Sequence, residues 1–179
     1  RQNSENIEII TKTDKPGIDI MVKPGTKGET VYIPAVITHG GVDDLVYNDF
    51  YIGEDADVTI VAGCGVHNCD CEDSHHNGIH RFFLAKNSKV LYLEKHYGEG
   101  DGSGKRIINP ETEVFAEEGS TMEMNTVQIK GVDSTKRVSK AELKDGAKLV
   151  ITEKIMTHGD QTAETSFDVI MSGKDSSCH

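Results

Sequence analysis

The sequence predicts an all-β protein built as an irregular β-solenoid, and two patterns carry that prediction. Apolar and polar residues alternate with period two at several places, including 58–62, 90–93 and 167–171, as in strands that bury one face. A short polar turn rich in Asp, Asn and Gly recurs between such strands. Helical periodicity is nearly absent, so we expect strands throughout.

The recurring turn defines a repeat along the chain. Its spacings are 32, 31, 27 and 30 residues, measured between Asp55, Asn87, Glu118, Asp145 and Asp175. A weaker copy occupies 22–25, and Asp, Asn and Gly are turn formers. One strand–turn–strand unit cannot bury its apolar face alone, so stacked copies must do so. The uneven spacing favours a β-helix whose loops bulge from one edge. An antiparallel β-sandwich is the alternative, since tight turns also make hairpins.

The 179 residues fit one domain, in which we expect a polar lead-in over 1–20 and the β-helix core over 21–179. A net charge of −11 without a basic run argues against nucleic acid as a partner. No apolar stretch is long enough to span a bilayer, and no signal-peptide pattern is present. The chain begins without Met and ends just after an apolar run, so we expect a fragment of a longer protein.

Cysteine and histidine are concentrated in one segment, 64–80, which also carries three acidic residues. Thiolate and imidazole together suit Zn²⁺, Fe²⁺ or an iron–sulfur cluster. The spacing matches no standard zinc or ferredoxin pattern, so a solvated polar loop with incidental thiols is the alternative. The candidate metal ligands are Cys64, His67, Cys69, Cys71, His75, His76, His80 and, from the next repeat, His96. The clustered thiols do not form a spread disulfide framework, so we expect reduced cysteines and a cytoplasmic protein.

Cys64 and His96 occupy equivalent places in successive repeats. Each lies nine residues after its turn anchor, Asp55 or Asn87. If each repeat is one coil, the two side chains lie on neighbouring rungs about 4.8 Å apart. Cys64 is then either a buried, inert residue or a presented, reactive thiol, and His96 is either its neighbour or a strand-end residue facing water.

The Gly-rich segment 97–105 ends in Gly-Lys but does not fit a phosphate-binding loop. Arg106 replaces the required Ser or Thr, and the segment carries two acids. We expect a long flexible loop there. No Gly-x-Ser-x-Gly or His-Glu-x-x-His pattern occurs in the chain, so we expect no enzymatic turnover.

Several segments together are similar to one family. They are Gly63-Cys64 with the loop that follows, and segments 93–100, 127–135 and 157–164. They resemble the SufB/SufD family of iron–sulfur cluster assembly scaffold proteins, in particular its short archaeal or anaerobe-type members. The similarity covers roughly residues 30–179.

The resemblance implies a right-handed parallel β-helix and a part in building an iron–sulfur cluster from iron and sulfur. It implies three partners: a SufC-like ABC-type ATPase, a second SufB/SufD-type chain in a homo- or heterodimer, and a sulfur donor protein. It also implies that Cys64 is the sulfur acceptor. The family's further coils and C-terminal helical segment, which docks on the ATPase, do not follow His179 here.

Two other functions stay open at this point. One is a β-solenoid interaction module with a structural metal site in residues 64–80. The other is a metal-dependent or carbohydrate-active β-helix enzyme. Only 10 of the 179 residues are Phe or Tyr, which argues against a groove for stacking sugars.

Overall fold

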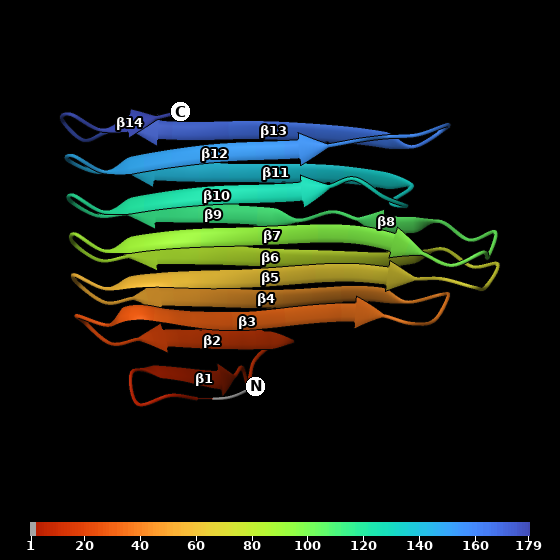
Figure 1. Cartoon of the computed structure of the whole chain (residues 1–179), viewed down its shortest axis with the longest axis horizontal. Helices are drawn as coiled ribbons and strands as arrows, with labels where there is room; N and C mark the ends of the chain where they lie inside the picture. The colour runs from red at the N-terminus through yellow and green to blue at the C-terminus, as the bar shows by residue number, and fades with distance from the viewer. Residues whose placement is uncertain (1–2) are drawn as a thin grey trace.

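The chain climbs as a coil through two facing β-sheets, and the computed structural model describes residues 3–179 of it (Figure 1). The larger sheet contains β1 (Ile7–Thr11), β2 (Gly17–Val22), β4 (Asp43–Ile52), β6 (Ser74–Leu84), β8 (Arg106–Ile108), β9 (Glu111–Ala116), β11 (Ser134–Leu143) and β13 (Thr162–Met171). The smaller sheet contains β3 (Lys27–Ile37), β5 (Asp57–His67), β7 (Lys89–Glu99), β10 (Thr121–Gln128), β12 (Lys148–Ile155) and β14 (Ser177–Cys178). Within residues 3–179 no helix is suited to crossing a membrane.

Strand direction confirms the β-helix and shows that the antiparallel sandwich is wrong. Consecutive strands after β1 alternate between the sheets, except that β8 and β9 both lie in the larger sheet, and neighbours within each sheet run parallel, as in β3–β5, β5–β7 and β7–β10. The pair β1–β2 is antiparallel. The tight turns therefore join one sheet to the other, and do not fold a strand back on its neighbour.

The recurring turns lie at the left of Figure 1 and the longer loops at the right. Each turn has one residue with a left-handed backbone, namely Gly25, Asp55, Asn87, Gly119, Gly146 or Asp175. The sequence anchors Glu118 and Asp145 each precede that residue by one position. A hydrogen bond from a backbone N–H to the carbonyl oxygen three residues earlier closes the turn, as from Ser88 N to Ala85 O at 3.2 Å. Asp and Asn tolerate this backbone better than other side chains, which explains the repeat.

Residues 7–20, expected as part of a polar lead-in, form strands β1 and β2 and join the core. Ile7, Ile18 and Ile20 are buried there, because their alternating positions turn apolar side chains inward. On the outer face, Lys12 bridges Asp19 and Asp49, which also pairs with Arg81 at 2.5 Å. Residues 1–2, the start of the expected lead-in, lie outside the described part of the chain.

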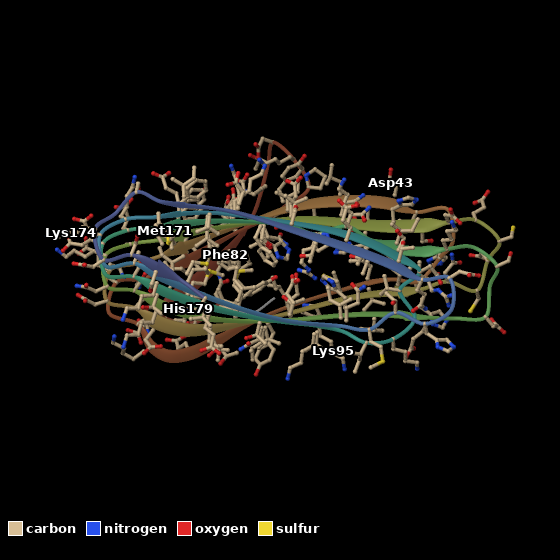
Figure 2. All side chains as sticks on the ribbon, turned by 90° about the horizontal axis from the view of Figure 1, so that it is seen from above. Asp43, Phe82, Lys95, Met171, Lys174 and His179 are labelled. Atoms are coloured by element: carbon tan, nitrogen blue, oxygen red, sulfur yellow. The ribbon has the colours of Figure 1, made fainter. Side chains whose placement is uncertain are left out.

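The space between the sheets is divided into an apolar part and a polar part. Near the tight turns it is filled by residues such as Phe50 and Phe82, whose rings stack at 4.4 Å, and Leu84. Figure 2 shows Phe82 between the two layers of ribbon. Further toward the loops, the inward positions of the same strands carry buried His, Glu, Arg and Thr side chains. This polar part is the candidate functional site.

Candidate functional site

A buried polar cluster occupies the interior of the solenoid. Strand alternation turns its members inward from both sheets, so their polar atoms meet in the middle. The cluster comprises Cys64 from β5, His76 and His80 from β6, Tyr92, Glu94 and His96 from β7, Thr126 and Gln128 from β10, and Arg137 from β11. Buried ionisable groups require partners, and these residues provide them for one another.

An ion pair between Glu94 and Arg137 lies at the centre of the cluster. Arg137 Nη1 donates to Glu94 Oε2 at 2.7 Å, and both side chains are fully enclosed. Arg137 Nε also lies 3.1 Å from Glu153 Oε1. Burial by itself would raise the pKa of Glu94, but His96 and Arg137 outweigh it and hold that pKa well below its usual range. The interior therefore contains a carboxylate and a guanidinium, each of which makes the burial of the other tolerable.

A chain of hydrogen bonds runs toward Glu94 from the opposite sheet. Tyr92 donates its hydroxyl proton to Glu94 Oε1 at 2.9 Å, so its oxygen accepts from His80 Nδ1 at 2.7 Å. His80 Nε2 is then the acceptor facing Asn48 Nδ2 at 3.3 Å. Burial lowers the pKa of His80 to about 4. The imidazole is accordingly neutral near pH 7, which matches its position in the chain of donors.

His96 lies between the two central charges. Arg137 Nη2 is 3.0 Å from His96 Nδ1, and since a guanidinium can only donate, Nδ1 accepts and Nε2 carries the proton. His96 Nε2 is 3.3 Å from Glu94 Oε1, but the angles do not make a hydrogen bond. Gln128 Oε1, on the neighbouring rung, is also buried and without a hydrogen-bond partner in residues 3–179. Buried polar atoms without a partner are rare in folded proteins, so these two atoms single out the cluster as an unusual part of the core.

Cys64 lies beside His96, as the repeat predicted. Their Cα atoms are partners across strands β5 and β7, and both side chains face the interior. Cys64 is only 4% exposed. Burial raises the pKa of its thiol and Glu94 raises it further, while the positive charge of Arg137 opposes both. Cys64 is thus an enclosed, protonated thiol in the resting structure.

The structure divides the eight candidate metal ligands between the inside and the outside of the coil. Cys64, His76, His80 and His96 are buried; His67, Cys69 and Cys71 are exposed, and His75 is half-buried. The division follows from alternation along the strands, which sends His75 outward and His76 inward, where its Nδ1 meets Asp44 at 2.7 Å. No group of three His, Cys, Asp or Glu side chains in residues 3–179 is arranged to hold a metal ion. Metal binding by these residues stays a prediction.

The Gly-rich segment packs against the Cys-containing loop and is not a free loop. A Cβ on Gly100, Gly102 or Gly104 would lie 2.1–2.3 Å from backbone atoms of Asn68, Asp70 and Glu72. Glycine is required there because the two backbones touch. The glycines therefore serve contact between adjacent coils.

Sequence reasoning missed Glu94 and Arg137, which hold the cluster together. The signal for Glu94 was present, because it shares inward register with Val90, Tyr92 and His96 in an alternating strand. A charged residue at such a position marks a buried site. Arg137 gave no comparable sign: its partner Glu94 is far away in sequence, and only coiling brings β7 and β11 to face each other.

Fold and site together define a parallel β-solenoid scaffold with an enclosed thiol beside an interior ion pair. A family model described as "SUF system FeS cluster assembly, SufBD core domain" matches residues 47–179, which include Cys64, Glu94, His96 and Arg137. The chain belongs to this family, and its role lies in iron–sulfur cluster assembly by the SUF system. No curated protein and no solved structure matches the chain.

Proposed function

We propose that this protein is a sulfur-accepting scaffold without turnover of its own, and that Cys64 holds the sulfur. The observation that carries the proposal is the enclosed Cys64 thiol, in register with His96 and within the electrostatic influence of Arg137. Family membership supports a role in cluster assembly; the identity of the acceptor rests on this geometry.

Transfer to Cys64 is an exchange between a persulfide and a thiol. The Cys64 sulfur attacks the outer sulfur of a donor persulfide, the donor's S–S bond breaks, and the donor leaves as a thiol. No net oxidation or reduction takes place. Burial and Glu94 disfavour an anionic sulfur at this position, whereas the positive charge of Arg137 favours it, so the closed site does not by itself stabilise an anionic persulfide.

An enclosed thiol needs an opening before a donor reaches it. The proton on Cys64 and its burial both keep the resting site unreactive. A SufC-like ABC-type ATPase as partner would supply the conformational work that parts the coil. A second SufB/SufD-type chain and a sulfur donor protein complete the proposed assembly, with iron and the growing cluster as its cargo. We place this assembly in the cytoplasm.

Retention of labelled sulfur tests the role of Cys64. The protein is incubated, together with its SufC-like ATPase and ATP, with a persulfide donor carrying radioactive sulfur, and then washed briefly with a thiol reductant that strips exposed persulfides. We expect the wild type to retain label on the peptide that contains Cys64, because burial shields it from the reductant. The Cys64→Ser variant should retain almost none.

The matched control is Cys178→Ser, which removes a partly buried free thiol from the far strand β14. It should retain as much label as the wild type. Equal retention by Cys64→Ser and wild type would remove Cys64 from the mechanism and overturn the proposal.

A further inference from the structure

A second thiol site lies on the outside of the coil, in the loop between β5 and β6. The Sγ atom of Cys69 is 3.2 Å from Nε2 of His67, and both side chains are exposed. An imidazole at this distance can take the thiol proton, which produces the thiolate that reacts in sulfur exchange. The enclosed Cys64 lacks both features, since it is inaccessible and protonated.

The loop holds its thiols in place through Asp70, which lies between Cys69 and Cys71. The Asp70 amide donates to Asn68 Oδ1 at 2.9 Å, and its carbonyl accepts from Gly104 N at 3.0 Å. Its carboxylate accepts from Gly40 N at 2.7 Å. These contacts tie the loop to the loops of the coils on either side. The flanking thiols are therefore presented to solvent from a fixed backbone.

Asn68 secures the same loop from within. Its side chain is fully buried, and Nδ2 donates to Glu72 O at 2.8 Å, which closes the loop around Asp70. The backbone N–H of Asn68 also donates to Glu99 O of the next coil at 2.9 Å. A surface thiol in an incidental polar loop needs none of this support. Preorganised presentation is instead what a group-transfer site needs.

We propose that Cys69, with His67 as its proton acceptor, is an outer acceptor site that takes sulfane sulfur from a persulfide. This inference rests on the proposed function in that the sulfur serves cluster assembly. Cys69 loses its proton to His67 Nε2 and attacks the outer sulfur of the donor persulfide. The donor S–S bond breaks as the new bond to Cys69 Sγ forms. The electron pair leaves on the donor sulfur, which takes the proton from His67, so the step is redox-neutral.

Cys71 offers a matched control within the same loop. It is exposed like Cys69 and two residues away, but no hydrogen bond to its side chain occurs in the described part of the chain. The two thiols therefore differ chiefly in the imidazole contact. A difference in their rates of sulfur uptake would report on that contact, since accessibility is shared.

The experiment follows the first moments of sulfur transfer to the whole protein. Cysteine persulfide is the small-molecule donor in one arm, and a persulfide carried on a cysteine desulfurase is the donor in the other. After a rapid quench with an alkylating agent, mass spectrometry locates the added sulfur atom. In at least one arm we expect Cys69 to acquire sulfur first, and early uptake to fall at least about tenfold in Cys69→Ser but not in Cys71→Ser.

The role of His67 has its own readout. His67→Ala should slow uptake at Cys69, and free imidazole in the buffer should restore it, which loss of loop structure alone would not permit. If Cys71 or Cys64 acquires sulfur as fast as Cys69 in the wild type in both arms, the outer site is wrong. If Cys64 retains reductant-resistant sulfur while Cys69 acquires none, the outer site is wrong and the proposed role of Cys64 stands. Uptake at Cys69 with no retention at Cys64 overturns the proposed role of Cys64 alone.

Discussion

The decisive residues of this protein are polar ones placed where an ordinary β-solenoid would carry apolar side chains. Glu94 and His96 follow Val90 and Tyr92 at inward positions of β7. Their burial is tolerable because Arg137 reaches across from the other sheet. A buried ion pair of this kind stabilises little compared with an apolar core. Stability therefore does not explain why Glu94 and Arg137 are buried here, which points to a role in binding and chemistry.

His80 makes the stability of the protein sensitive to acid. Burial lowers its pKa to about 4 in the folded protein from an ordinary value of 6.5. Between these values the unfolded chain binds a proton that the folded chain excludes, so stability is full above pH 6.5 and falls as the pH drops to 4. The free energy of unfolding lost through the protonation of His80 amounts to about 3 kcal/mol. Urea unfolding of the wild type at intervals from pH 7 to pH 4 should show it.

The variant His80→Gln should unfold more easily at pH 7 but lose less stability on acidification, because Gln has no proton to gain. The exposed His158 provides the control, and His158→Gln should keep the wild-type dependence on pH. If the free energy of unfolding of His80→Gln depends on pH as it does in the wild type, other groups cause the acid sensitivity.

At the level of the strand and the loop, the two edges of the solenoid follow different rules. The tight-turn edge repeats one conformation: each turn has a left-handed residue and a hydrogen bond that closes it, which in the turn at Asp175 comes from the Ser176 hydroxyl to Gly173 O. The loop edge varies in length and sequence, and its order comes from contacts between adjacent coils. The thiol loop, for example, is tied to Gly40 on one side and Gly104 on the other.

Gly98 tests whether close contact between coils holds the loop edge together. A Cβ there would lie 1.9 Å from Gly131 O, a backbone atom that cannot move aside without shifting its coil. We expect Gly98→Ala to lower the free energy of unfolding by about 1–3 kcal/mol, the usual cost of overpacking. Chemical denaturation measures the difference.

Gly63 provides the control because it lies in the neighbouring strand β5 with open space around the place of a Cβ. Gly63→Ala should change stability by less than about 0.5 kcal/mol. Similar losses in both variants would mean that the loss of glycine itself, and not the contact with Gly131, determines the outcome.

The whole molecule is a stack in which each coil rests on its neighbours. A central strand such as β7 pairs on both edges, with β5 and β10, whereas β13 pairs with β11 and β1 with β2. The residues of β13 are mostly exposed, and those of β7 are alternately buried. Stability in such a stack is a sum of terms for each coil and for contacts between neighbours.

In a chain of these 179 residues, amide hydrogen exchange should therefore be slowest in β5, β7 and β10 and fastest in β1 and β13, which each pair on one edge within residues 3–179. The central strands open only when two interfaces are lost, while the outer strands open when one is lost. Mass spectrometry of peptic fragments can measure the gradient. Uniform protection from β1 to β13 would mean that the stack unfolds as a single cooperative unit.

Local patterns in the sequence favoured the β-helix over the antiparallel sandwich and predicted one contact within the site. Period-two alternation and a recurring turn are local signals, so they predicted strands, stacked coils and the shared rung of Cys64 and His96. The groups that surround Cys64, and the division of the thiols between the interior and the solvent, are set by how the two sheets fold together. Glu94 and Arg137 meet because two sheets close over each other, and the segment 64–80 separates into an inner and an outer set because strand register sends neighbours to opposite faces. Such pairings depend on the geometry of the whole coil, which no short stretch of sequence contains.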